Sequence, residues 1–224
     1  MKILALDTST EYCSLALWQD GSVLSREILA GQKHTELLLP LLQEMLAESG
    51  LTLAQLDGFA FGAGPGSFTG LRIACGIVQG LALATDLPVI GISTLEAMAQ
   101  RIGASHVMTA LDARMGEIYY AAYIHTADGW SNVQAPILCL PQHIPPLPGD
   151  NCWIGCGSGF DQHHEMLSTL YSGSLCRIDR GCYPRAQEMA QLAAPRLMKG
   201  LGVSAEEAAP VYIRNKVALK ESER

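Results

Sequence analysis

The stretch FAFGAGPGSFTGLRIACGIVQGLALATD, residues 59–86, links a short apolar run to a long apolar segment through a loop of glycines and one proline. A short apolar run bounded by glycines predicts a buried strand, and the longer segment predicts a helix. A strand that turns directly into a helix is a building unit of α/β proteins. We therefore interpret the rest of the chain as support for this unit or as its partner.

The glycines of this loop suggest a phosphate site, because bare backbone N–H groups ahead of a helix N-terminus bind anions. The spacing fits neither standard motif: Leu71 stands where a Walker loop needs lysine, and Ser67 where the dinucleotide motif needs its third glycine. The alternative is a tight turn capped by Ser67 or Thr69. Both interpretations stay open, and a vestigial nucleotide or phosphate site would comprise Asp7, Thr8, Ser9, Gly64, Gly66 and Ser67.

The helix after the loop is apolar nearly all round. Its charged and amide residues form one thin row at sevenfold spacing: Arg72, Gln79 and Asp86. Gly76, Gly80 and Ala84 recur every fourth residue and leave a groove in which another helix can approach closely. Such a helix is either buried or covered by a partner. We do not expect a membrane span, because Gln79 interrupts the segment and about 20 apolar residues are needed.

The rest of the first hundred residues predicts strands and helices around this unit. Three runs predict an antiparallel meander with a hairpin turn at Asp20-Gly21: residues 2–7, 13–18 and 22–29. Helical periodicity and apolar runs predict the elements that follow: a helix over about 33–48, a strand at 58–61, a strand at 88–92 and a helix from 94 to about 102.

Two helices of this half, over 33–48 and 69–86, carry more apolar surface than one sheet can cover. Ordinary packing on the sheet accounts for one face of each helix, and the remainder predicts a helical docking face. The residues expected at that face are His34, Leu38, Leu41, Leu42, Met45, Leu71, Ile73, Gly76, Gly80 and Leu83.

The second half repeats the beginning of the first. An apolar strand at 106–111 ends in Leu111-Asp112-Ala113, which echoes Leu6-Asp7-Thr8, and two more runs complete a second meander. We expect an N-terminal lobe over residues 1–103 and a second, reduced lobe over 104–224. The remaining expectations are strands at 117–125, 133–140 and 153–157, helices at 160–167 and 186–198, of which the last packs back on the first lobe, and a frayed polar end at 221–224.

The composition of the 224-residue chain leaves too little charge for a fully hydrated surface. Charged residues make up 17% and hydrophobic residues 49%, against roughly 25% charged in average proteins. That deficit predicts an oligomer or a subunit of a complex. The net charge of -7 argues against direct nucleic-acid binding, because contacts to phosphates need clustered lysine and arginine.

Seven cysteines are scattered along the chain without a C-x-x-C pair, so we expect reduced thiols that serve as small apolar residues. Cys152 and Cys156 lie near His163 and His164, but the spacing matches no common zinc pattern, so no metal site is expected. Asp7 interrupts the apolar N-terminus, which therefore does not predict a signal peptide. We expect the chain to be cytoplasmic.

Two meanders followed by alternating helices and strands are typical of the actin, sugar-kinase and Hsp70 (ASKHA) superfamily, with a ribonuclease H-like fold and a cleft between two lobes. Within it the chain closely resembles the TsaB family, also called YeaZ. The matching segments span nearly the whole chain: LALDTST at 4–10, His34-Thr35-Glu36, GPGSFTGLRI at 64–73, LDARMGEIYYA at 111–121 and PVYIR at 210–214. The resemblance implies a two-lobed α/β fold, with mixed sheets, flanking helices and a reduced second lobe.

The resemblance also implies a function. It implies that this chain, like TsaB proteins, is a non-catalytic paralogue of TsaD. TsaD is the subunit that transfers threonylcarbamoyl from threonylcarbamoyl-AMP to N6 of adenosine 37 (t6A37) in tRNAs that read codons beginning with adenine. The implied partners are TsaD in a heterodimer, TsaE in a ternary complex and a second copy in isolation, without direct tRNA binding. No cofactor is expected for this chain, although a nucleotide at the complex interface stays open.

TsaD-like proteins carry an H-x-x-x-H pair that binds a metal, because imidazoles at i and i+4 share one helix face. Here His34 is followed by Leu38, so the resemblance implies no metal site. The alternative is an ATP-using enzyme of the sugar-kinase type, with Asp7 holding a metal. Asp112 would then be the base, unless it forms a structural ion pair with Arg114. A stand-alone hydrolase is not expected, because Gly157-Ser158-Gly159 lacks the spacing of a nucleophile elbow.

Overall fold

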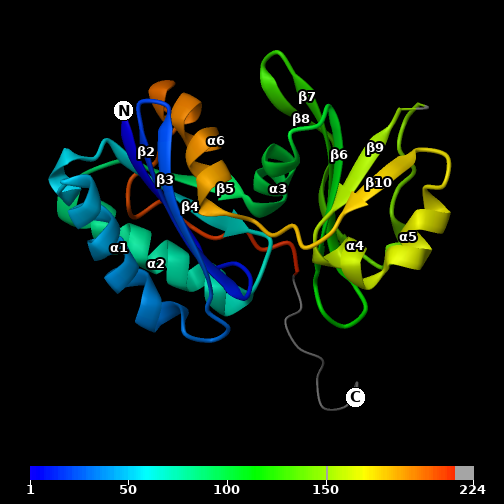
Figure 1. Cartoon of the computed structure of the whole chain (residues 1–224), viewed down its shortest axis with the longest axis horizontal. Helices are drawn as coiled ribbons and strands as arrows, with labels where there is room; N and C mark the ends of the chain where they lie inside the picture. The colour runs from blue at the N-terminus through cyan, green and yellow to red at the C-terminus, as the bar shows by residue number, and fades with distance from the viewer. Residues whose placement is uncertain (150, 215–224) are drawn as a thin grey trace.

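In the computed structural model, which describes residues 1–149 and 151–214, the chain forms two five-stranded mixed sheets with flanking helices. Figure 1 shows the two sheets side by side, the first built from the blue to green part of the chain and the second from the green to yellow part. The polar end 221–224, expected to fray, lies outside the described residues. The two-lobed α/β fold expected from the sequence is confirmed.

The first sheet has the strand order β3-β2-β1-β4-β5. The meander is antiparallel, and the last two strands run parallel to β1. Asp20 and Gly21 both have positive φ at the turn between β2 and β3, which confirms the predicted hairpin. The strands are β1 (Lys2–Asp7), β2 (Tyr12–Gln19), β3 (Ser22–Leu29), β4 (Gly58–Gly64) and β5 (Val89–Ser93).

Both faces of the first sheet are covered by helices, so that alternate residues of β1 serve two cores. Leu4 and Leu6 belong to a core shared with α1 and α2, whereas Ile3 and Ala5 belong to a core shared with α6. Figure 1 shows α3 between the two sheets. The helices of this lobe are α1 (His34–Ser49), the short 3-10 turn η1 (Leu53–Gln55), α2 (Phe68–Thr85), α3 (Thr94–Ile102) and α6 (Ala186–Met198).

The second sheet repeats the topology of the first, with the order β10-β9-β6-β7-β8. A meander is again followed by strands parallel to its first member, β6. The sequence echo therefore reflects a repeated topology. The strands are β6 (His106–Asp112), β7 (Ile118–Thr126), β8 (Gly129–Cys139), β9 (Trp153–Cys156) and β10 (Leu175–Asp179).

Two details of the second lobe correct the sequence interpretation. The single helix expected at 160–167 is two short helices, α4 (Ser158–Gln162) and α5 (His164–Leu170), because His163 between them leaves the helical conformation. The strand β10 was not predicted, since its five residues are only partly buried and lack a clear alternation. A short 3-10 turn, η2 (Pro141–His143), lies in the connection between β8 and β9.

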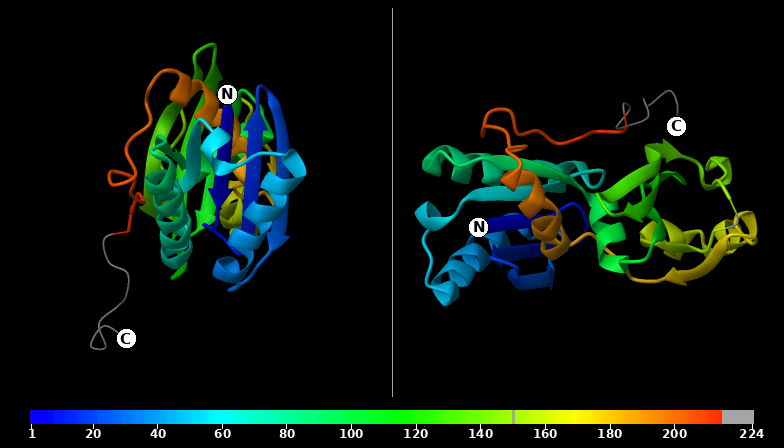
Figure 2. Two further views of the ribbon diagram at one scale, coloured as in Figure 1. Left: turned by 90° about the vertical axis from the view of Figure 1, so that its left-hand side faces the viewer. Right: turned by 90° about the horizontal axis from the view of Figure 1, so that it is seen from above.

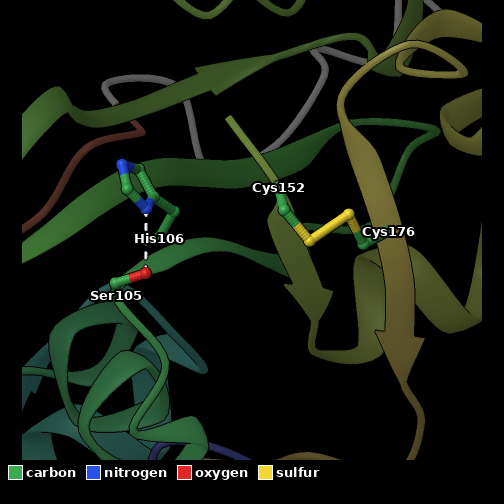
Figure 3. Close-up of a disulfide and its surroundings, with 4 residues drawn as sticks. All are labelled: Ser105, His106, Cys152 and Cys176. Carbon is green, nitrogen blue, oxygen red and sulfur yellow. Dashed lines mark hydrogen bonds between the residues drawn. A yellow bond between two sulfur atoms is a disulfide. The ribbon is translucent and has the colours of Figure 1, made fainter. Parts of the chain in front are cut away.

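The strand β10 also explains a third correction, which concerns the cysteines. Cys152 and Cys176 form a disulfide (Figure 3), so the expectation of reduced thiols is wrong for this pair. The two residues are 24 apart in sequence, but the parallel pairing of β9 and β10 brings their Cα atoms to 5.5 Å. Of the other cysteines, Cys139 is half-buried and four are buried free thiols, as expected for small apolar residues: Cys13, Cys75, Cys156 and Cys182.

Beyond α6 the chain returns along the first lobe and reaches the second. Figure 2 shows this orange and red segment running across the molecule in the view from above. The backbones of Val203 and Val89 exchange hydrogen bonds of 2.8 and 2.9 Å, and the N–H of Val211 donates to Ala63 O at 2.7 Å. The segment thus contributes one wall of the space between the lobes.

Candidate functional site

The glycine loop packs directly on the turn that follows β1. The N–H of Ser67 donates to Ser9 O at 2.7 Å, and Thr8 Oγ1 donates to Gly70 O at 2.6 Å. A Cβ at Gly70 would overlap the carbonyl of Thr8, and one at Gly66 would lie 2.6 Å from Ser9 O. These glycines are therefore required for a close backbone approach, which favours the tight-turn interpretation of the loop.

Ser67 is the N-cap of α2, and its Oγ accepts a hydrogen bond from Gly70 N at 3.3 Å. Of the two predicted caps, Ser67 is confirmed, because its side-chain oxygen satisfies one of the first free N–H groups of the helix. Thr94 Oγ1 donates to Pro65 O at 2.5 Å from the other side of the loop. The loop is thus held by β1 and by the start of α3.

Asp7 is buried and only partly satisfied. Its Oδ2 accepts hydrogen bonds from the Oγ of Ser9 at 2.9 Å and the N–H of Ser9 at 3.3 Å. Its Oδ1 lies against Gly62 beside Met189 of α6, and has no hydrogen-bond partner within the described residues. Burial raises the pKa of Asp7 to about 7, and the hydrogen bonds from Ser9 oppose that rise. The buried carboxyl group therefore binds a proton more readily than an exposed aspartate does.

A cleft of about 930 Å³ separates the two lobes. Ser9, Gly66 and Ser67 of the predicted phosphate site line it, together with Asp112 and Arg114 across the gap. The other three predicted residues do not line the cleft: Asp7, Thr8 and Gly64. The geometry therefore splits the predicted site, because the carboxylate that would hold a metal points toward α6.

The opposite wall is the turn between β6 and β7. Asp112 Oδ1 accepts the N–H of Arg114 at 2.9 Å, and the Arg114 Nε lies 4.0 Å from Asp112 Oδ2. The N–H of Asp112 donates to Ser158 Oγ at 3.0 Å. Asp112 is therefore engaged in local structure, as in the ion-pair interpretation. Arg114 and Met115 both adopt left-handed backbone conformations, which cost energy outside glycine.

His34 clamps the turn after β1. Its Nε2 lies 2.9 Å from Thr10 O and 3.3 Å from Tyr12 O. Because both partners are carbonyl oxygens, this nitrogen carries a hydrogen and donates. Leu38, at the position of the second metal ligand, is fully buried. Within residues 1–149 and 151–214, no group of three or more His, Cys, Asp or Glu side chains could hold a metal ion.

The long helix α2 has one buried and one open side. Only 33% of it is buried, and by length and composition alone it is apolar enough to cross a membrane. A Cβ added at Gly76 or Gly80 would meet nothing within 4 Å, and Leu83 is 70% exposed. We call the exposed row the α2 stripe: Phe68, Arg72, Gly76, Gly80, Leu83 and Ala84.

The structure corrects half of the predicted docking residues. His34, Leu38, Leu42, Met45 and Leu71 are buried within the lobe, so they are wrong as surface contacts. Sequence periodicity could not separate them, because both helices are apolar on more than one face. Of the rest, Leu41 and Ile73 are half-buried, and Gly76, Gly80 and Leu83 are exposed.

Sequence reasoning also missed an exposed apolar position. Leu39, 46% exposed, lies on the outer side of α1. Ala84, which the fourfold spacing already grouped with Gly76 and Gly80, is exposed and continues the α2 stripe. No comparable signal marked Leu39, which stands within a run of leucines.

Comparison with known proteins is consistent with the fold and with these motifs. The model of the family described as "TsaD: tRNA N6-adenosine threonylcarbamoyltransferase" matches residues 27–150. The "tRNA threonylcarbamoyladenosine biosynthesis protein TsaB" of Escherichia coli K12 is 41% identical, covering 98% of this chain and 97% of that protein. Its namesake in Haemophilus influenzae is 40% identical, with coverage of 98% and 96%.

Solved structures give the same result. The structure described as "YeaZ from Pseudomonas aeruginosa" superposes with a TM-score of 0.88 at 38% identity, covering 94% of this chain and 99% of that one. Similarity at this identity extends over nearly the full length of both chains. The chain therefore belongs to the TsaB family, also called YeaZ.

Proposed function

We propose that this chain is a non-catalytic subunit of the machinery that forms threonylcarbamoyladenosine at position 37 of tRNAs reading codons that begin with adenine. In this role it binds and activates a TsaD transferase, which transfers threonylcarbamoyl from threonylcarbamoyl-AMP, with TsaE as a third subunit. The relatives in E. coli and H. influenzae are named for the biosynthesis of this nucleoside. The observation that carries the docking role is the open α2 stripe.

The α2 stripe fits a partner helix. Small residues at fourfold spacing let a second helix backbone approach closely, and the open space over Gly76 and Gly80 leaves room for its side chains. Burial of the exposed Leu83 and its neighbours would supply about 25 cal/mol per Å² of apolar area. A partner helix packed along the α2 stripe would cover this exposed apolar area. The stripe is therefore suited to helix-on-helix docking.

The occupant is a chain of the TsaD family. The TsaD family model matches residues 27–150, a range that contains both α1 and α2. A TsaD protein would therefore present equivalent helices, and two similar helix pairs can pack about a local twofold axis. By the same argument, a second copy of this chain would occupy the stripe when the transferase is absent.

Several features support a role without its own chemistry. Asp7 faces α6 rather than the cleft, and the imidazole of His34 is committed to two carbonyl groups. The net charge of -7 supports tRNA contact through the transferase rather than through this chain. We propose no cofactor for this chain, a nucleotide only at the interface between subunits, and action in the cytoplasm.

The docking role is tested by the affinity for purified TsaD transferase. We expect Gly76→Trp to weaken binding by about tenfold or more, because the indole fills the space that a partner helix would take. Gly173→Trp is the matched control, since Gly173 also has nothing near its Cβ position but lies in the second lobe. Equal affinity of both variants and wild type would rule out docking on the stripe.

The non-catalytic role is tested by reconstitution with TsaD, TsaE, ATP, threonylcarbamoyl-adenylate and tRNA. Product is expected to depend on this chain, and Asp7→Asn should support as much product as the wild type. Asn keeps the shape of the carboxyl group and removes its charge and basicity. An Asp7→Asn variant that binds TsaD but gives no product would show that this chain contributes chemistry.

A further inference from the structure

Residues 201–214, which we call the strap, hold the first lobe at several points. The backbone pairing of Val203 with Val89 anchors its beginning on the edge strand β5. Farther along, Gln79 Nε2 of α2 donates to Ala208 O at 2.9 Å. The N–H of Val211 then donates to Ala63 O at 2.7 Å, beside the glycine loop. Figure 2 shows the strap lying along this lobe on its way to the second.

The strap contacts the exposed end of the α2 stripe. The Nε of Arg72 donates to the hydroxyl of Tyr212 at 2.9 Å, and its guanidinium carbon lies 3.7 Å from the centroid of the Phe68 ring. The rings of Phe68 and Tyr212 are 5.3 Å apart. Cation–π and aromatic contacts of this kind stabilise the arrangement of the three side chains. Tyr212 of the strap is therefore held by Phe68 and Arg72, which belong to the proposed docking face.

Two residues farther on, the strap is fixed to the second lobe. Arg214 donates to Ala113 O at 2.9 Å and pairs with Glu117 at 2.8 Å, and its side chain is only 14% exposed. Ile213 packs against the core between α3 and the second sheet. The contacts of Arg214 with Ala113 and Glu117 lie on the turn between β6 and β7, which forms a wall of the cleft.

We propose that the strap couples the α2 stripe to the cleft. A transferase docked over Phe68 and Arg72 fixes Tyr212, and through Ile213 and Arg214 it holds the turn at 113–117 in place as a cleft wall. The coupling rests on the proposed function for its occupant. Since coupling between two sites is reciprocal, a ligand in the cleft changes the affinity for the transferase by the same factor.

The proposal predicts a local effect rather than separation of the lobes. The helix α3 also joins the lobes, because Ala97 packs with the core of the first sheet and Met98 with that of the second. Loss of Arg214 should therefore release the turn while the lobes stay together. The left-handed residues Arg114 and Met115 favour this outcome, since strained turns persist only where their surroundings hold them.

The first test uses hydrogen exchange in the free chain. Arg214→Ala is expected to speed exchange of the backbone amides at 113–118 by about tenfold, as for the loss of a charged hydrogen bond. Arg177→Ala is the matched control, because Arg177 forms an ion pair with Asp179 on β10, away from the strap. Unchanged exchange at 113–118 in Arg214→Ala would overturn the proposal, whether or not a partner binds.

The second test adds the TsaD transferase. Its binding is expected to slow exchange at 113–118 in the wild type and in Arg177→Ala. In Arg214→Ala the slowing should disappear while binding remains. Equal slowing in all three proteins would overturn the coupling.

If the transferase does not bind the wild type, the proposed function fails, and Tyr212→Ala decides the coupling in the free chain. Tyr212 contacts α2, so coupling requires faster exchange at 113–118 in this variant. Unchanged exchange would overturn the proposal.

Discussion

Asp7 and Asp112 occupy equivalent places in the two lobes, each at the end of the first strand of a meander. Asp7 is buried, and one of its oxygens has no partner within the described residues. Asp112 lies on the cleft wall and is paired with the backbone and side chain of Arg114. The two turns share a topology, but Met189 of α6 lies beside Asp7, whereas Asp112 borders the cleft.

The difference shows that the elements packed on each turn determine the environment of its acid. In the first lobe, the loop at 64–70 packs on Thr8 and Ser9, and Asp7 is buried beside Gly62 of β4 and Met189 of α6. In the second lobe, the connection from β9 to α4 supplies Ser158 as a hydrogen-bond acceptor for the Asp112 backbone. Repeated topology thus preserves the position of an acid but not its chemistry.

The largest expected effect comes from adding one methyl group to the loop. Gly70→Ala places a Cβ onto the carbonyl of Thr8, and we expect a loss of about 5 kcal/mol in the free energy of unfolding, or failure to fold. Gly76→Ala in the same helix meets open space and should stabilise by roughly 0.5–1 kcal/mol. Urea denaturation of both variants measures the difference. Similar stabilities would show that the loop does not pack tightly on the turn.

The second effect depends on pH. Burial raises the pKa of Asp7 from 3.8 to about 7, so the folded state binds the proton more tightly than the unfolded state does. The contribution of protonated Asp7 to the free energy of unfolding is fully present below about pH 4 and is lost as the pH rises through about 7. Asp7→Asn should therefore stabilise the chain by about 4 kcal/mol at pH 8, at 1.36 kcal/mol per pH unit.

The check is urea denaturation of wild type and Asp7→Asn at pH 4 and pH 8. The increase in the free energy of unfolding of Asp7→Asn over wild type should be much smaller at pH 4 than at pH 8. Asp112→Asn is the counterpart in the second lobe, where the partner Arg114 is exposed. It should stay within about 1 kcal/mol of wild type at pH 8. A gain in Asp7→Asn that is the same at both pH values would contradict the burial of a titrating carboxyl group.

Local sequence signals predicted the frame of both lobes. The hairpin at Asp20-Gly21 and the cap at Ser67 depend on turn chemistry within a few residues, and both are present. The echo of Leu6-Asp7-Thr8 in Leu111-Asp112-Ala113 indicated the repeated meander. These features could be predicted because hydrophobic periodicity and turn-forming residues depend only on positions that are close together in the sequence.

Which face of a helix or strand is buried could not be predicted from neighbouring residues in the same way. Leu38 is buried and Leu39 exposed within one run of leucines, and no polar residue in that run marks the outer face of α1. Whether Asp7 faces the cleft or α6 depends on Gly62 and Met189, which are far from it in sequence. The strap lacks periodicity altogether, so its contacts with α2 and with the second lobe were invisible.

The smallest of the three effects concerns the second lobe alone. Cys176→Ser removes the disulfide that joins β9 to β10, and a closed loop of this length stabilises by about 3 kcal/mol through the unfolded state. Amide exchange in 153–156 and 175–179 should accelerate, because opening this edge of the sheet becomes easier. Exchange around Asp7 should not change, since the glycine loop and α6 hold that turn from the first lobe. Added reductant should reproduce the effect in the wild type and leave Cys176→Ser unaffected. Faster exchange in both lobes would instead mean that the two environments are not independent, and that β10 supports the first lobe through the chain that leads into α6.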